Sequence, residues 1–389
     1  MMPKSIISYL VNHPEFALRL LSQYFTFTPQ QLKRYADVLI WEIISNNSNI
    51  RWTSETLWKY AERLDWNSIS MNPSAFADID MLNEFDAFIE WKGLGNGCFD
   101  SIANNAGLPW TEEFIKSVEH KINFEKLSTN ESVQWSETII DRYKGKWDIV
   151  DLASNESVPW TLTLFERHLD ESHFFYYGVE TNPAILRNFD MVEKYYHKIE
   201  WWVLFSSSVL PWKEMNLMER WRDHIDWYGL SLNEYFFRTD SQFFAKNIDK
   251  WLMNNCRGFT GLSSNQQLPW TSRLIEKYLP FWCWTSLCTN EAIPWNEEMI
   301  DYFTDYVEWG GTKPCGIYNE EGEMIAPTGG KSYEFGLVNN KNLPWSMEFL
   351  NRYESQIEPD DLRSNSAVWE KAFKPYVDDK IVDTVLRII

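Results

Sequence analysis

The sequence lacks the long apolar run that a membrane-spanning helix requires, and cysteines are few. No stretch of about 18 consecutive apolar residues occurs, and the first residues, MMPKSIISYLVNHPEF, lack the apolar core of a signal peptide. Five cysteines are scattered at spacings that suggest neither a disulfide framework nor a zinc site: Cys98, Cys256, Cys283, Cys288 and Cys315. We therefore expect a cytoplasmic protein without a metal or other cofactor.

Positive charge is also scarce. The 389 residues include 36 Lys and Arg against 56 Asp and Glu, which gives a net charge of −20. Such a surface repels nucleic acids and anionic membranes, and it attracts basic partners. The acid could equally serve only to keep a chain with 22 tryptophans soluble. Because 44% of the residues are hydrophobic, general disorder is excluded.

What the sequence does contain is an asparagine that recurs with a period near 25 residues. Most steps are 25 residues, one is 50, and others are slightly longer, as insertions would make them. The asparagines are Asn47, Asn72, Asn105, Asn130, Asn155, Asn182, Asn233, Asn265, Asn290, Asn340 and Asn365, with Ser207 in the remaining place. A period of this length indicates structural repeats that stack on one another.

Aromatic residues keep the same phase as the asparagines. An opening tryptophan follows the asparagine by about five residues, at 52, 110, 135, 160, 212, 270, 295, 345 and 369. A closing aromatic follows about fourteen residues later, at 66, 91, 124, 174, 201, 227, 251, 284 and 309. With Trp41 included, 17 of the 22 tryptophans occupy one of these places. This regularity favours a role in the core over a role as a ligand platform.

Each period predicts a helix, a turn and a shorter helix. A Ser, Thr or Asn follows the opening tryptophan and is a good N-cap, and acidic residues suit the first helical turn. Apolar residues four, five and eight places after the tryptophan indicate a helix of roughly 11–13 residues. The closing aromatic begins one or two further turns, which the asparagine would end in the left-handed conformation. Alternatively, the asparagine side chains form a hydrogen-bonded ladder between neighbouring repeats.

These patterns predict an all-α fold, a superhelical solenoid of about twelve 25-residue helix–turn–short-helix repeats with one β-hairpin insertion. The expected organisation is an N-terminal helical cap at 1–40, a repeat array at 41–309, an insertion at 310–333, final repeats at 334–370 and a C-terminal cap helix at 371–389. The repeats near Asn72, Asn182 and Asn233 lack the Pro-Trp pair and depart from the pattern.

The most regular copies are FTGLSSNQQLPWTSRLIEKY (259–278) and WTSLCTNEAIPWNEEMIDYF (284–303). They resemble tandem repeats of the form Trp-x-x-Leu-Ser-x-Asn-x-x-Leu-Pro-Trp-Ser, which occur in many bacterial proteins of unassigned role. The resemblance covers roughly residues 40–370. It implies a repeat architecture, and it carries over neither a catalytic residue nor a ligand.

Two insertions interrupt the repeats, Lys92–Ala103 and Gly310–Tyr333. The second contains IYNEEGEMI, which is typical of a β-hairpin with a Glu-Gly turn. It is either a docking finger or a solvent loop where a repeat has been lost. If it docks a partner, the candidate binding residues are Tyr318, Glu320, Glu321, Glu323 and Lys331.

Two sequence patterns resemble a nucleotide-binding site and a catalytic or metal site, but neither is complete. The segment APTGGKS (326–332) resembles the end of a phosphate-binding loop, but Ile325 stands where that motif needs glycine and no helix is expected to follow. His168 and His173 are five residues apart, so they do not share a helical face, and no Ser-His-Asp or metal-ligand pattern completes a site. No catalytic residue is therefore assigned.

We expect a non-catalytic protein–protein interaction scaffold, monomeric, that binds a basic protein rather than nucleic acid or a membrane. A narrower form is an acidic immunity or inhibitor protein that neutralises its basic partner. Two alternatives stay open. One is a carbohydrate-binding protein that uses exposed aromatics such as Trp58, Trp147, Trp202 and Trp221. The other is an enzyme with a site in the insertions, which substitution of His168 and His173 would test.

Overall fold

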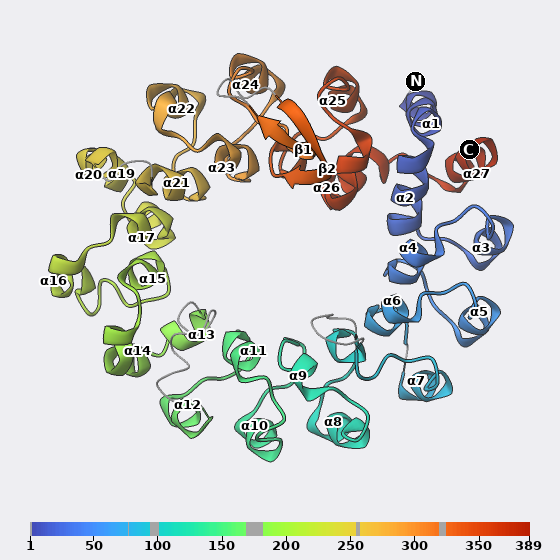
Figure 1. Ribbon diagram of the computed structural model, residues 1–389, viewed down its shortest axis with the longest axis horizontal. Helices are drawn as coiled ribbons and strands as arrows, with labels where there is room; N and C mark the ends of the chain where they lie inside the picture. Colours follow the sequence, from blue (N-terminus) through green and yellow to red (C-terminus); the bar gives the residue numbers. More distant parts are fainter. Residues whose placement is uncertain (1, 77, 94–100, 169–181, 254–256, 319–323) are drawn as a thin grey trace. The chain divides into compact units, whose positions relative to one another are not determined.

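The computed structural model consists of short helices and one antiparallel pair of strands (Figure 1). It describes residues 2–76, 78–93, 101–168, 182–253, 257–318 and 324–389. Within these residues the regular structure is helical apart from the strand pair, which confirms the predicted all-α class. The chain divides into two compact units: unit 1 comprises Met1–Leu20 and Asp226–Ile389, and unit 2 comprises Leu21–Ile225.

The first helix of each repeat begins just after the opening tryptophan or at the equivalent place. In unit 2 these helices are α3 (Pro29–Arg34), α5 (Ser54–Lys59), α7 (Ile79–Glu84), α8 (Glu112–Val118), α10 (Glu137–Arg142), α12 (Leu162–His168), α14 (Phe189–Tyr195) and α16 (Leu217–Arg220). In unit 1 they are α18 (Glu234–Thr239), α22 (Ser272–Lys277), α24 (Glu297–Tyr302) and α25 (Met347–Arg352).

The predicted N-caps start these helices. In α10 the hydroxyl of Ser136 accepts a hydrogen bond from the N–H of Ile139, and Glu137 lies in the first turn. Thr53, Thr111, Thr161, Thr271, Asn296 and Ser346 cap their helices in the same way. The predicted helix length is wrong, however, because α10 has 6 residues and ends before Tyr143. Apolar residues continue with helical spacing into the following turn, so the sequence pattern predicts a longer helix than the one observed.

The second helix of each repeat is about as long as the first, with 3–8 residues, so the predicted difference in length is wrong. In unit 2 these helices are α4 (Trp41–Asn46), α6 (Trp66–Met71), η1 (Ile102–Asn104), α9 (Phe124–Leu127), α11 (Ile149–Ser154), α13 (Pro183–Leu186) and α15 (Trp201–Ser206). In unit 1 they are α17 (Trp227–Leu232), α21 (Arg257–Ser264), α23 (Trp284–Thr289), η6 (Leu337–Asn339) and η7 (Pro359–Ser364). Several consecutive members of the same unit pack on one another, as α4 does on α6 and α21 on α23.

The remaining elements connect repeats or lie near the ends. They are α1 (Met2–Asn12), α2 (Pro14–Tyr24), η3 (Tyr196–Lys198), η4 (Arg222–His224), α19 (Phe243–Lys246), α20 (Ile248–Met253), η5 (Leu279–Phe281), β1 (Gly311–Tyr318), β2 (Met324–Glu334), α26 (Ser366–Val368), the π-helical turn η8 (Trp369–Phe373) and α27 (Asp379–Ile388). None of the helices in the described part of the chain is long and apolar enough to cross a lipid bilayer.

The repeated asparagines are buried and form a hydrogen-bonded ladder. The side-chain amide of Asn290 donates to the carbonyls of Ser263 (2.9 Å) and Asn265 (3.1 Å), and its oxygen accepts from the N–H of Ala292 (2.9 Å). Each of these asparagines likewise donates to a carbonyl in the preceding repeat: Asn47, Asn72, Asn105, Asn130, Asn155, Asn182, Asn265, Asn340 and Asn365. These bonds satisfy carbonyls that the end of a helix leaves without partners.

The asparagines therefore end the second helices, but the expected left-handed conformation is wrong. Asn290 has φ −70° and ψ 110°, which is extended backbone. The alternative interpretation, a ladder between repeats, is the one observed. Among the described non-glycine residues only Asn216, outside the ladder, has a positive φ, at 48°.

A serine or cysteine two residues before the asparagine makes a second link. The hydroxyl of Ser45 accepts the N–H of Asp65 at 2.9 Å, twenty residues further along the chain. The same bond joins Ser70 to Glu90, Ser128 to Asp148, Ser263 to Cys283 and the thiol of Cys288 to Glu308. It fixes the backbone where the next short helix begins.

The opening tryptophans fill the core, as predicted. All nine are less than 10% exposed. The indole N–H of Trp135 donates to the carbonyl of Asn130 at 3.0 Å, so the ring is held by the asparagine of its own repeat. Trp110, Trp270 and Trp345 repeat this bond. The closing tryptophans are mostly half-buried, and Trp251 is fully buried.

The two ends of the chain share a core inside unit 1. Helix α1 packs against α25 and α27 (Figure 1). The rings of Tyr9 and Phe16 lie against that of Phe373, with centroids 6.1 and 6.0 Å apart. Phe373 is completely buried, so residues from both ends exclude water from the same place.

Candidate functional site

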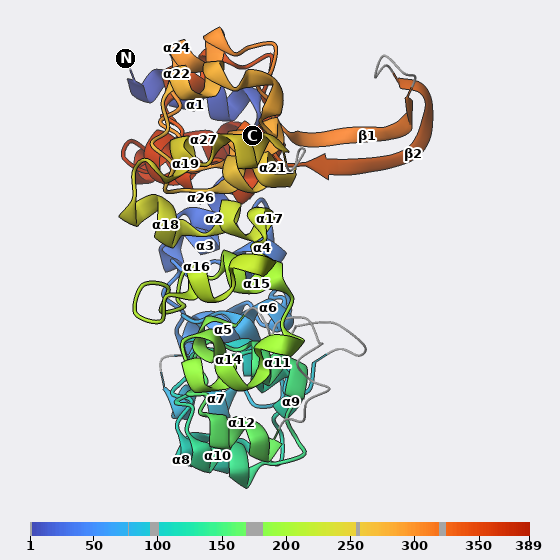
Figure 2. The ribbon, with the colours of Figure 1, turned by 90° about the vertical axis from the view of Figure 1, so that its left-hand side faces the viewer.

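The strand pair occupies the predicted insertion and extends away from the helices of unit 1 (Figure 2). Tyr318 is the last residue of β1 and pairs with Met324, whereas Lys331 on β2 pairs with Pro314. Four residues of strand therefore separate the two positions, about 13 Å at the usual rise. The structure does not bring these two candidates together. The other three, Glu320, Glu321 and Glu323, lie outside the described residues.

Glycines anchor the base of the strand pair. Gly310 and Gly311 have φ of 78° and 94°, a backbone conformation that favours glycine. A Cβ on Gly311 would lie 2.2 Å from a carboxylate oxygen of the buried Asp361. The chain returns to the helices at Leu337, whose N–H donates to the carbonyl of Glu308 at 2.8 Å. The backbone at the base is therefore fixed on both sides.

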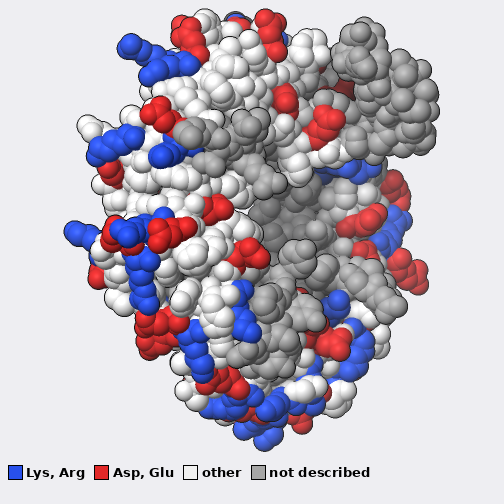
Figure 3. Space-filling view, turned by 60° about the vertical axis from the view of Figure 1, so that its left-hand side comes forward, with Lys and Arg blue, Asp and Glu red and all other residues white. Residues whose placement is uncertain are grey.

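Ion pairs join the first helices of neighbouring repeats along the surface. The guanidinium of Arg142 lies 2.6 Å from Glu112, and that of Arg167 lies 2.5 Å from Asp141 and 3.5 Å from Glu137. Further pairs between first helices are Lys194–Glu166, Arg220–Glu193 and Arg352–Asp301. The turns that follow first helices are joined in the same way by Arg63–Asp37 and Lys121–Asp86. Figure 3 accordingly shows Lys and Arg side chains beside Asp and Glu over much of the face drawn there.

A tyrosine often reinforces the pair. The hydroxyl of Tyr353 donates to Asp301 at 2.9 Å, next to Arg352. The hydrogen bond from Arg352, followed by the one from Tyr353, holds the pKa of Asp301 below its ordinary value of 3.8. Burial, together with the hydrogen bond to Asp301, raises the pKa of Tyr353 to about 12. Acid, cation and phenol thus form one unit between two repeats.

The contact between α22 and α24 departs from this pattern. Tyr302 stands where Arg142, Arg167 and Arg352 stand, seven residues after the opening tryptophan. Its hydroxyl donates to Glu276 at 2.6 Å, and that hydrogen bond is the main cause of its raised pKa. A cavity of about 360 Å³ opens beside it, lined by Ser272, Glu276, Asn296, Glu298, Met299 and Tyr302. We call this cavity the α22–α24 groove.

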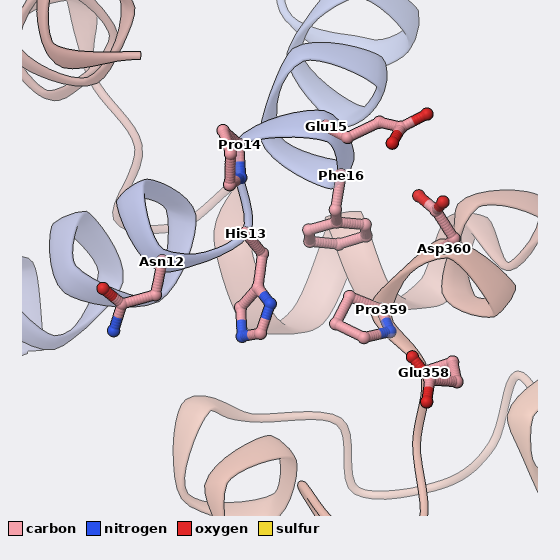
Figure 4. A pocket seen from close by; sticks show the side chains of 8 residues that line it. All are labelled: Asn12, His13, Pro14, Glu15, Phe16, Glu358, Pro359 and Asp360. Atoms are coloured by element: carbon pink, nitrogen blue, oxygen red, sulfur yellow. The ribbon is translucent and has the colours of Figure 1, made fainter.

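A second cavity, of about 330 Å³, lies where α1 meets α2. Figure 4 shows the Phe16 ring with the carboxylates of Glu15 and Asp360 to one side and the His13 ring to the other. His13 lies 3.9 Å from Glu354, and Glu15 is already paired with Arg19 at 3.4 Å. Within the described residues no group of three His, Cys, Asp or Glu is arranged to hold a metal ion.

Of the two histidines named for a test of enzymatic activity, the structure describes only His168. His168 ends α12, and its Nε2 lies 2.5 Å from Asp141, within the ion-pair cluster with Arg167. His173 lies outside the described residues. Cys283 and Cys288 are free thiols, and burial raises the pKa of Cys288 to about 12, so it is protonated at neutral pH.

Of the four tryptophans named for carbohydrate binding, two are buried and two are exposed. Trp147 and Trp221 are buried at 6% and 5% exposure. Trp58 and Trp202 are 49% and 38% exposed, as a carbohydrate-binding surface would require. The Trp58 indole donates to Glu84 at 2.6 Å and its ring lies against Phe85, so it is held within a contact between repeats.

The described residues form a tryptophan-rich fold that is helical apart from one projecting strand pair, with a groove lined by Glu276 and Glu298. Comparison with family models, with curated proteins and with solved structures found no match. Two features were missed in the sequence: the linking role of the serine before the asparagine, and the missing cation at Tyr302. Both are visible there once the repeats are aligned on their opening tryptophans.

Proposed function

We propose that this chain is a non-catalytic protein–protein interaction scaffold, built as a solenoid of 25-residue helix–turn–short-helix repeats, and that it binds a basic protein. The residues that recur have internal partners: the asparagine amides, the linking serines and most opening indoles bond within or between repeats. The recurring residues therefore stabilise the scaffold, and we expect the partner to bind at segments that do not recur.

The observation that carries the proposal is the strand pair. Strands β1 and β2 have 8 and 11 residues and, within the described residues, pair only with each other. An isolated two-stranded ribbon is marginally stable in water, and both outer edges offer backbone groups to a further strand. Extended partners commonly add to such edges. An anchored ribbon of this length is therefore well suited to docking another chain.

The charge favours a basic partner. The net charge is −20, and cations such as Arg63, Arg142 and Arg167 are already engaged in the pairs between neighbouring repeats. Uncompensated acids would accelerate association with a positively charged protein and disfavour nucleic acid. A narrower form of the proposal, an immunity or inhibitor protein that neutralises a basic toxin, is supported by the charge alone.

Trimming the ribbon tests the proposal. Replacement of residues 313–332 by Asn-Gly keeps the pairs Gly311–Glu334 and Thr312–Tyr333 and closes them with a tight turn. Full-length and trimmed proteins are used to capture partners from the source organism's lysate at about 50 mM and about 500 mM salt. We expect a basic protein that only the full-length chain retains, and only at low salt.

Thermal unfolding of both proteins is the control, since the trimmed chain must keep its fold. Capture of the same proteins by both chains would show that the ribbon is not the docking element. If neither chain retains a basic protein at low salt, the binding proposal itself fails.

A further inference from the structure

We infer that the α22–α24 groove receives an arginine side chain of the protein partner. This inference rests on the proposed function and deepens it, because it names the chemical group that the scaffold recognises. Its support comes from a comparison of this contact with the equivalent contacts elsewhere in the same chain.

The equivalent contacts show what the repeats place there. In each of these contacts, two acids follow an opening tryptophan by two and six residues. They face a cation that follows the next opening tryptophan by seven residues. Arg167 thus meets Glu137 and Asp141, and Arg352 meets Glu297 (3.6 Å) and Asp301. A guanidinium held by carboxylates between two first helices is therefore an arrangement that this chain already contains.

At α22–α24 the acid is present and the cation is not. Glu276 occupies the same place as Asp141 and Asp301, but Tyr302 opposite it offers a neutral hydroxyl. The following residue, Phe303, is buried and lacks the hydroxyl that Tyr353 donates in its own contact. No Lys or Arg occurs from residue 278 to residue 312, and no described cation pairs with Glu276 or Glu298.

The groove has the size and lining that a guanidinium needs. Its volume is about 360 Å³, and the carboxylates of Glu276 and Glu298 come from its two sides. Met299 is 6% exposed and supplies an apolar floor, while Tyr302, 61% exposed, presents a ring on which a planar cation can stack. Asn296 and Ser272 add neutral acceptors. Arginine fits this set better than lysine because it is planar and has several donors.

The test uses the peptide acetyl-Gly-Arg-Gly-amide and its lysine and citrulline counterparts. The probe is the ¹³C-methyl signal of Met299, assigned with Met299→Leu. We expect the arginine peptide to shift this signal with millimolar saturation at low salt, lysine to bind several-fold more weakly, and neutral citrulline to have no effect. The double variant Glu276→Gln/Glu298→Gln should weaken arginine binding by about tenfold or more.

Three control variants make the result specific. Glu291→Gln/Asp305→Asn removes the same charge from acids of the same stretch that do not line the groove, and it should leave binding within about twofold. Tyr302→Arg supplies the missing cation from within the chain; it should abolish peptide binding and raise Tm. Tyr302→Phe, which removes only the hydroxyl, should keep binding.

The outcomes separate this inference from the proposed function. Equal loss of binding in both double variants would mean that only net charge matters, and unchanged binding in Tyr302→Arg would place the peptide elsewhere; either result overturns the inference. If the arginine peptide does not bind but the ribbon-dependent partner is still captured, the groove assignment fails while the scaffold proposal stands.

Discussion

At the scale of single residues, the ladder asparagine explains why one residue type recurs. It must donate to carbonyls of the preceding repeat and accept an N–H of its own repeat, all without charge in a buried place. Asn290 does this with three hydrogen bonds at 4% exposure. Aspartate lacks the donors and serine lacks the reach, so only the amide satisfies every partner.

Substitution of Asn290 should therefore be costly. Asn290→Ala leaves the carbonyl of Ser263 without its amide donor and the N–H of Ala292 without its acceptor, whereas the carbonyl of Asn265 keeps the Trp270 indole. We expect a loss of about 3 kcal/mol in the free energy of unfolding. Asn290→Asp should cost more at neutral pH, because a buried carboxylate would face those carbonyls. Urea unfolding of the two variants measures this order. A loss below about 0.5 kcal/mol for both would mean that the ladder does not stabilise the fold.

Cys288 tests the second recurring link. It stands where other repeats have Ser45, Ser70 or Ser128, and its thiol accepts the N–H of Glu308 at 3.2 Å. Cys288→Ser should be nearly neutral, since serine makes this bond elsewhere in the chain. Cys288→Ala should cost about 1 kcal/mol through the lost acceptor. Equal stability of the two variants in urea unfolding would rule out a role for the hydrogen bond.

At the scale of elements, the sequence predicted how helices start better than where they end. Ser136 and Glu137 are local signals that act within one turn, so the start of α10 was readable. Its end was not, because Tyr143 continues the apolar face after the helix has stopped. Nor could the sequence show which side chains meet across helices. Tyr302 and Glu276 are 26 residues apart, and their contact depends on stacking.

The Asp301–Arg352 contact between α24 and α25 should make stability depend on pH. The pKa of Asp301 is lower in the folded chain than its ordinary value of 3.8, so its stabilisation is complete above that value and is lost as pH falls through the folded pKa. Asp301→Asn should lower Tm at neutral pH and reduce the further decrease below about pH 4. Thermal unfolding across this range is the measurement, with Asp305→Asn as the control.

If Asp301→Asn and Asp305→Asn showed the same Tm at every pH, the ion pair would contribute nothing. The two carboxylates lie on one surface stretch, and among the residues that the structure describes only Asp301 of the two has a cation partner. The ion pair predicts that the Tm of Asp301→Asn is lower than that of Asp305→Asn at neutral pH, and that this difference disappears at low pH.

The base of the strand pair depends on glycine. Gly311→Ala would place a methyl group 2.2 Å from the Asp361 carboxylate, at a φ of 94° that alanine disfavours. We expect a loss of about 2 kcal/mol or more. Gly145→Ala is a matched control, because Gly145 has a φ of 82° with open space around it. Equal losses for the two would assign the effect to backbone conformation alone.

At the scale of the whole molecule, the negative charge surplus is uneven along the chain. In places on the face drawn in Figure 3, Lys and Arg side chains lie beside Asp and Glu, and cations such as Arg142 and Arg167 pair with acids of the preceding repeat. The surplus is evident where cations are missing from the sequence, as between residues 278 and 312. Composition alone motivates the proposal of a basic partner, whereas the proposed groove depends on the contact between α22 and α24, which only the structure shows.

The most direct test of the account is photo-crosslinking in the source organism. A photoreactive residue at Ser272, on the rim of the α22–α24 groove, is compared with one at Glu348 on α25, outside the groove. We predict one basic protein cross-linked from Ser272 and not from Glu348, with the product lost in Glu276→Gln/Glu298→Gln. No cross-linked protein from Ser272, or the same products from both positions, would contradict recognition of a basic partner at this groove.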